Sequence, residues 1–120
     1  RKRGIKVCLN TGYSKEMASY IINKVKLDDY IDGFMTSDQV KMGRPYPYMI
    51  HKLMERFSIL SGDSIIKVGD TCIDILEGKN AHTKYQISVL SGADNYETLA
   101  TKNPYLIIKD VSDLAEYITY

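Results

Sequence analysis

Short apolar runs alternate along the chain with stretches in which apolar residues recur at helical spacing. The apolar runs predict five strands, at 5–10, 33–37, 64–69, 85–90 and 105–109. The helical spacing predicts helices at 14–26, 45–57, 73–81 and 111–120. The chain therefore reads βαβαβαβαβα, and this alternation predicts an α/β fold with a parallel sheet that has helices on both faces.

Two helix starts carry local signals. Ser14 is a residue type that caps helices, and it precedes the first helical stretch. Pro45 and Pro47 stand near the start of the second helical stretch, where a missing backbone N–H costs little.

Composition narrows the class of protein. The 120 residues are 44% apolar and 26% charged, which is ordinary for one soluble globular domain or a piece of one. The formal net charge of +1 gives no electrostatic support for a nucleic-acid partner, and no apolar run approaches the roughly 20 residues needed to cross a bilayer. Cys8 and Cys72 form no CxxC pair, so a cytoplasmic location is expected. Because the first residue is Arg1 rather than Met, one interpretation is that the chain is a fragment of a longer one.

Three polar clusters come directly after predicted strands, at 10–14 (NTGYS), 43–48 (GRPYPY) and 69–74 (GDTCID). In parallel sheets covered by helices, ligands bind beyond the carboxyl ends of the strands. The three clusters are therefore the candidate site.

Asp70 and Asp74, with Thr71 between them, suit a hard cation, because Mg²⁺ takes oxygen ligands and commonly one or two carboxylates. The structural alternative is a helix start in which Asp70 is the N-cap and Asp74 lies in the first turn. Both interpretations stay open for this cluster alone.

The other two clusters suit an anion. Thr11 and Gly12 offer a hydroxyl and backbone N–H groups at a strand-to-helix turn, which can hold a phosphate oxygen. An ordinary turn with Ser14 as a cap is the alternative. Arg44 stands between Gly43 and Pro45 and can bind phosphate in a bidentate way, although a solvated surface Arg is the commoner case. Together, a hydroxyl, a cation and a carboxylate pair after successive strands favour a site for a phosphate-like group and a metal.

These residues resemble motifs two, three and four of the haloacid dehalogenase (HAD) superfamily. The resemblance covers about Gly4 to Leu90, and within the superfamily the segments TGYS, GRPYPYM and IKVGDTCIDILEGKNA are most similar to the phosphonoacetaldehyde hydrolase group. Many HAD phosphatases have Lys where Arg44 stands, so the Arg is the more specific feature. His82 departs from the pattern, since such proteins often have Gly there.

The resemblance implies a role for each site residue. Thr11 would bind the phosphoryl group, Arg44 would stabilise its charge, Asp70 would ligate Mg²⁺, and Asp74 would support the metal site directly or through neighbouring groups. The implied substrate-binding residues are Thr11, Gly12, Tyr13, Arg44 and Thr71.

The resemblance also implies parts that this sequence lacks. The family's nucleophile is an Asp in a DxDxT-like segment on a strand between those at 5–10 and 64–69, and phosphonatases carry a Lys on a helical cap. No DxDxT segment is present, so residues 1–120 are expected to be a partial HAD-like core domain with a Rossmann-like fold that lacks the nucleophile strand and the cap. Expressed alone, such a piece would expose strand edges and be unstable.

The expected function is therefore Mg²⁺-dependent hydrolysis at phosphorus on a small phosphonate, cleaving a P–C bond. Three alternatives remain: a phosphate-ester phosphatase resembling phosphoglycolate phosphatase, a non-catalytic remnant that keeps the anion site, and a signalling receiver domain. The receiver is disfavoured because its acidic residues stand on early strands, whereas the first strand here ends in Asn10-Thr11. A homodimer is a compatible oligomeric state.

Overall fold

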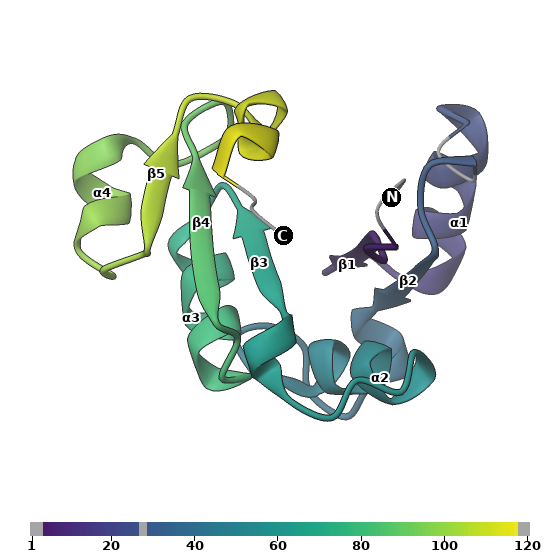
Figure 1. Ribbon diagram of the computed structural model, residues 1–120. Helices are drawn as coiled ribbons and strands as arrows, with labels where there is room; N and C mark the ends of the chain where they lie inside the picture. The colour runs from purple at the N-terminus through teal and green to yellow at the C-terminus, as the bar shows by residue number, and fades with distance from the viewer. Residues whose placement is uncertain (1–3, 27–28, 118–120) are drawn as a thin grey trace. The chain divides into compact units, whose positions relative to one another are not determined.

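The computed structural model describes residues 4–26 and 29–117, without the side chains of 115–117. The chain divides into two compact units, Arg1–Leu60 and Ser61–Tyr120. Figure 1 labels the helices and strands of both units. No helix in the described part of the chain is long and apolar enough to span a membrane.

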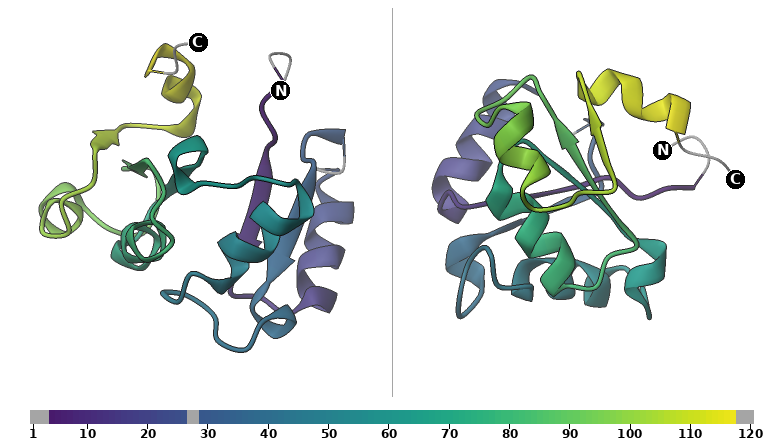
Figure 2. Two further views of the ribbon diagram at one scale, coloured as in Figure 1. Left: turned by 60° about the horizontal axis from the view of Figure 1, so that its bottom comes forward. Right: turned by 90° about the vertical axis from the view of Figure 1, so that its left-hand side faces the viewer.

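The first unit is a two-stranded parallel sheet between two helices. β1 (Cys8–Thr11) pairs with β2 (Gly33–Thr36), so that Thr11 lies opposite Thr36 at the carboxyl end of both strands. α1 (Lys15–Lys24) and α2 (Tyr48–Arg56) lie on opposite faces of this sheet, and the short 3₁₀ turn η2 (Ser37–Gln39) follows β2 (Figure 2). The buried apolar residues of this unit come from both helices and from β2: Ala18, Ile22, Met35, Met49 and Ile50.

The second unit is a three-stranded parallel sheet in the order β3-β4-β5. Its strands are β3 (Ile66–Gly69), β4 (Tyr85–Val89) and β5 (Leu106–Ile108). α3 (Cys72–Asn80) and α4 (Tyr96–Ala100) lie on one face, and the 3₁₀ helix η4 (Val111–Tyr117) lies on the other (Figure 2). A short 3₁₀ turn, η3 (Gly62–Ser64), leads into β3.

The two faces of this second sheet differ in chemistry. The face toward η4 is apolar, with Ile87, Val89 and Ile108 buried against Leu114 and other partly buried apolar residues. The face toward α3 carries buried polar side chains, since Lys67 and Gln86 stand opposite each other in register and both contact the helix at Gly78. A polar sheet face under a helix needs internal partners for its polar atoms, and Lys67 finds them in Asp74 and Glu77 of α3.

All five predicted strands are confirmed, and so are the helices predicted at 14–26, 45–57 and 73–81, with shorter bounds. The alternation implies a helix between β4 and β5 without placing it, and α4 occupies that position. The last predicted helix is of the 3₁₀ type over the described residues, and 118–120 lie outside them. The alternation alone predicts one parallel sheet. Among the described residues the strands form two parallel sheets, and no strand of one sheet pairs with a strand of the other.

His82 ends α3 in a conformation that favours glycine. Its φ is +59°, directly after the last helical turn, where the N–H of His82 donates to the carbonyl of Lys79 at 3.0 Å and that of Thr83 to Gly78 at 3.0 Å. The left-handed region costs a residue with a Cβ about 1 kcal/mol. His82, where such proteins often have Gly, is therefore a strained residue in the turn that ends α3.

Replacing His82 with Gly in the full-length product of the gene that encodes this chain should raise the free energy of unfolding by about 1 kcal/mol. Urea-induced unfolding measures the change. Lys79→Gly, at an exposed position inside the same helix, is the matched control and should lower stability by about 1 kcal/mol. A loss of stability in His82→Gly would contradict the assignment of strain to this turn.

Candidate functional site

The turn after β1 presents a hydroxyl with its donor available. Thr11 Oγ1 accepts a hydrogen bond from the backbone N–H of Tyr13 at 3.2 Å. Within the described part of the chain, the Thr11 hydroxyl donates to no protein acceptor. Ser14 caps α1 as the sequence predicts, since its Oγ accepts from the N–H of Met17 at 3.2 Å. Because the cap and the Thr11 hydroxyl are separate groups, the capping alternative leaves Thr11 able to bind an anion.

Arg44 lies beside this turn. Its Nη2 is 3.6 Å from the position that a Cβ on Gly12 would occupy, so the guanidinium is in contact distance of the backbone between Thr11 and Tyr13. The Arg44–Pro45 peptide bond is cis. The structure thus brings together two clusters that stand about thirty residues apart in the sequence, and it places a cation next to a hydroxyl at the carboxyl end of β1.

The turn is held from the other side by residues that follow β2. Ser37 Oγ donates to the carbonyl of Gly12 at 2.8 Å, and both carboxylate oxygens of Asp38 accept from the N–H of Lys15 at 3.0 Å. The buried Thr36 hydroxyl also donates to Asp38, at 2.5 Å. The hydrogen bond from Thr36, followed by that from Lys15, holds the pKa of Asp38 below its ordinary value. These contacts fix the backbone that carries Thr11 and Gly12, and the sequence analysis did not single them out.

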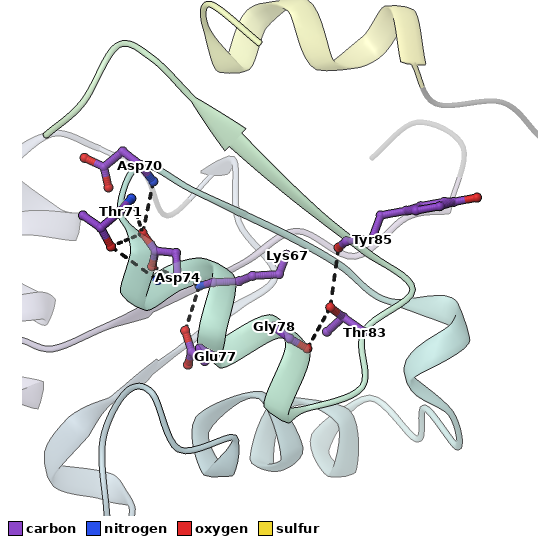
Figure 3. A network of polar contacts seen from close by, with 8 residues as sticks. All are labelled: Lys67, Asp70, Thr71, Asp74, Glu77, Gly78, Thr83 and Tyr85. Atoms are coloured by element: carbon purple, nitrogen blue, oxygen red, sulfur yellow. Dashed lines mark hydrogen bonds and ion pairs between the residues drawn. The ribbon is translucent and has the colours of Figure 1, made fainter. Parts of the chain in front are cut away.

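In the second unit, Asp70 directly follows β3 and is a partly exposed residue. Its Oδ2 accepts from the N–H of Ala93 at 3.0 Å, and its Oδ1 has no hydrogen-bond partner among the residues that the structure describes. Figure 3 shows the carboxylate of Asp70 pointing away from that of Asp74. One oxygen of Asp70 is therefore positioned by the protein while the other is available to a ligand.

Asp74 is buried and turned toward the backbone of the loop that carries Asp70. Its Oδ2 accepts from the N–H of Asp70 at 3.0 Å, the N–H of Thr71 at 3.1 Å and the hydroxyl of Thr71 at 2.9 Å (Figure 3). Thr71, rather than Asp70, is the N-cap of α3, and Asp74 completes a capping box. The capping alternative is thus correct for Asp74 and wrong for Asp70.

A buried cation stands behind Asp74. Lys67 Nζ lies 3.7 Å from Asp74 Oδ1 and 3.1 Å from Glu77 Oε1 (Figure 3). Glu77 is fully buried, and Lys67 and Asp74 are 8% and 5% exposed. The sequence analysis missed Lys67 and Glu77, because a Lys on a strand and a Glu on a helix each read as ordinary surface residues.

The loop after β4 closes over Asp70. Besides the Ala93 contact, the N–H of Asp94 donates to the carbonyl of Asp70 at 3.2 Å, and Asp94 Oδ2 accepts from the N–H of Cys72 at 2.9 Å. A Cβ added at Gly92 would overlap the side chain of Asp70, so only glycine permits this approach. The sequence analysis also missed this loop, whose signal is the polar run SGADN after a strand.

The donor set fits one carboxylate ligand for Mg²⁺. Mg²⁺ commonly keeps several waters and binds one or two carboxylates, and Asp70 is a partly exposed residue that offers one available oxygen. Both oxygens of Asp74 face protein groups, so its geometry suits support of Asp70 rather than direct ligation. Within 4–26 and 29–117, no group of three or more His, Cys, Asp and Glu side chains is placed to hold a metal. Thr71 uses its hydroxyl in the capping box, and Tyr13 is 57% exposed.

Two curated proteins with the same description resemble the chain. The chain is 38% identical over 95 residues to the phosphonoacetaldehyde hydrolase of Parabacteroides distasonis, a match that covers 78% of this chain and 36% of that protein. It is 42% identical over 82 residues to the phosphonoacetaldehyde hydrolase of Bacillus cereus strain B4264, covering 68% of this chain and 31% of that protein. The chain thus spans about a third of the length of these relatives.

Solved structures share the fold. The phosphonoacetaldehyde hydrolase-like protein from Oleispira antarctica is 24% identical with a TM-score of 0.85, covering 97% of this chain and 50% of that one. A predicted phosphoglycolate phosphatase from Haemophilus somnus is 19% identical with a TM-score of 0.87, covering 97% of this chain and 51% of that one.

The model of the haloacid dehalogenase-like hydrolase family matches residues 1–87, which include the turn after β1, Arg44 and the capping box that supports Asp70. Because this match covers most of the sequence, the chain belongs to the haloacid dehalogenase-like hydrolase family.

Proposed function

We propose that the full-length gene product is a Mg²⁺-dependent hydrolase that acts at phosphorus on phosphonoacetaldehyde or a closely related small phosphonate. The observation that carries the proposal is the contact of the Arg44 guanidinium with the turn of Thr11 and Gly12. A guanidinium and a free hydroxyl donor at the carboxyl end of a parallel strand suit a dianionic phosphoryl or phosphonyl group. The curated relatives support the phosphonate in particular.

Each residue has a distinct task in this proposal. The Thr11 hydroxyl donates to a phosphoryl oxygen, since its acceptor side is already used by Tyr13. Arg44 neutralises charge on the same group through two parallel N–H donors. Asp70 would hold Mg²⁺ through its available oxygen, and the ion would supply a positive charge at the carboxyl end of β3. Asp74 and Thr71 keep the Asp70 loop in place.

The experiment is a comparison of two substrates. The full-length gene product should release phosphate from phosphonoacetaldehyde with a kcat/KM at least about tenfold higher than from phosphoglycolate, and chelation of Mg²⁺ should abolish both activities. Measuring acetaldehyde together with phosphate separates P–C cleavage from ester hydrolysis. Faster turnover of phosphoglycolate would replace the phosphonate with a phosphate ester, and the absence of both activities would favour a protein that binds anions without catalysis.

A further inference from the structure

Lys67 is an unusual residue for its position, because a buried ammonium is costly unless charged partners meet it. It belongs to β3 and projects from the sheet face that α3 covers, with 8% of the residue exposed. Its Nζ meets Glu77 at 3.1 Å and Asp74 at 3.7 Å (Figure 3). The proposed function assigns Lys67 no task, although it contacts the residue that holds the Asp70 loop.

The two oxygens of Asp74 face in different directions and serve different partners. Oδ1 faces Lys67, while Oδ2 takes three hydrogen bonds from the loop, two from backbone N–H groups and one from the Thr71 hydroxyl. A carboxylate without a partner on Oδ1 could rotate about its terminal bond, whose torsional preference is broad. The ammonium beside Oδ1 is therefore placed to limit this rotation, together with the hydrogen bonds to Oδ2.

Close packing of α3 on the sheet makes this reach possible. A Cβ at Gly78 would lie 3.0 and 3.1 Å from Cβ and Cγ of Lys67, and 2.7 Å from Cγ of Gln86. Such distances are tighter than ordinary contacts, so a larger residue would push the helix outward. Glycine at 78 thus lets the Lys67 stem run along α3 toward Asp74 and Glu77.

We propose that Lys67 is a positioning residue, which orients Asp70 by holding the carboxylate of Asp74. Glu77 is the second anchor of the ammonium, and its position one helical turn after Asp74 places both carboxylates on the same side of α3. The inference rests on the proposed function in one respect, namely that Asp70 binds Mg²⁺.

The experiment compares Lys67→Met/Glu77→Gln with wild type in the full-length gene product. The double variant removes one positive and one negative buried charge, so that it avoids leaving two carboxylates without their cation. Backbone amides of Asp70 and Thr71 should exchange with solvent about tenfold faster or more, because their acceptor is no longer held. The Mg²⁺ concentration for half-maximal activity should rise about 10- to 100-fold, as for other residues that orient a metal ligand.

Gln86→Met is the matched control, since Gln86 stands opposite Lys67 in register on the same buried face. Its Nε2 donates to the carbonyl and hydroxyl of Thr83, at 2.9 and 2.8 Å. This variant should lower the melting temperature while leaving the amide exchange of Asp70 and Thr71 and the Mg²⁺ requirement unchanged. Equal effects of the two variants on these readouts would show that Lys67 is merely structural and would overturn the proposal.

Lys67→Arg adds a test by rescue, because it keeps a cation that can face both carboxylates. It should restore slow exchange at Asp70 and Thr71 and most of the Mg²⁺ affinity. Failure of this rescue with a wild-type melting temperature would also overturn the proposal. If the wild-type protein itself needs no Mg²⁺, the proposed function fails, while the amide exchange still decides whether Lys67 orders the loop.

Discussion

Replacing Asp70 with Asn in the full-length gene product should lower kcat/KM by about 10³-fold, since a metal-binding carboxylate supports several kcal/mol of transition-state charge stabilisation. In the wild type, Asp70 Oδ2 accepts a hydrogen bond from the N–H of Ala93 at 3.0 Å. The amide oxygen of Asn can accept the same bond, so the loop after β4 should keep its position. The charge at the available oxygen is lost. Steady-state kinetics across a Mg²⁺ series, together with calorimetric titration of Mg²⁺, measure the effect.

Asp110→Asn is the matched control for this prediction. Asp110 follows β5 as Asp70 follows β3, and its Oδ1 accepts a backbone N–H, that of Ser112 at 3.1 Å. It differs in that these hydrogen bonds are local, since the carbonyl of Asp110 also accepts from the N–H of Asp113 at 3.0 Å. Asp110→Asn should leave kcat/KM within about twofold of wild type. Unchanged Mg²⁺ affinity in Asp70→Asn would show that Asp70 is not a ligand of the ion.

The parts of the fold that depend on local sequence could be predicted. Strand positions follow from short apolar runs, and Thr11, Arg44 and Asp70 stand out because polar residues at the end of such runs mark the binding edge of a parallel sheet. The start of α2 moves from 45 to Tyr48, with Pro47 as the N-cap, because the proline-containing segment forms a turn before the helix begins.

The rest depends on packing between segments that are distant in the sequence. Nothing local to Lys67 or Glu77 marks them as buried, since their burial follows from the approach of α3 to β3 at Gly78. The role of Asp74 shows the same limit, because the pattern GDTxxD alone does not separate a ligand from a capping residue. The alternation predicts one sheet, whereas β1 pairs with β2 in one sheet and β3 pairs with β4 in another. A family strand between those at 5–10 and 64–69 stays a prediction.

Replacing Arg44 with Met in the full-length gene product should lower kcat/KM by about 10²- to 10³-fold, the usual cost of removing one preorganised donor of charge stabilisation. Arg44 Nη2 lies 3.6 Å from the position that a Cβ on Gly12 would occupy, next to the turn that carries Thr11, so the loss should fall on the group that both residues are proposed to bind. Met keeps most of the apolar stem of the side chain. Steady-state kinetics with phosphonoacetaldehyde measure the loss of kcat/KM, and calorimetry measures the Kd for inorganic phosphate.

Arg44→Lys separates charge from geometry. Lys keeps the positive charge and loses the two parallel N–H donors, so it should recover part of the activity lost in Arg44→Met, with a kcat/KM still about tenfold below wild type. Arg56→Met controls for the removal of an arginine from the same unit, because Arg56 Nη1 donates to the carbonyl of Phe34 at 3.4 Å and should affect stability alone. Equal activity in Arg44→Met and wild type would mean that the guanidinium near Gly12 binds no substrate. Full activity in Arg44→Lys would instead mean that a point charge suffices, and the Arg would then carry no preference for a phosphonate over a phosphate ester.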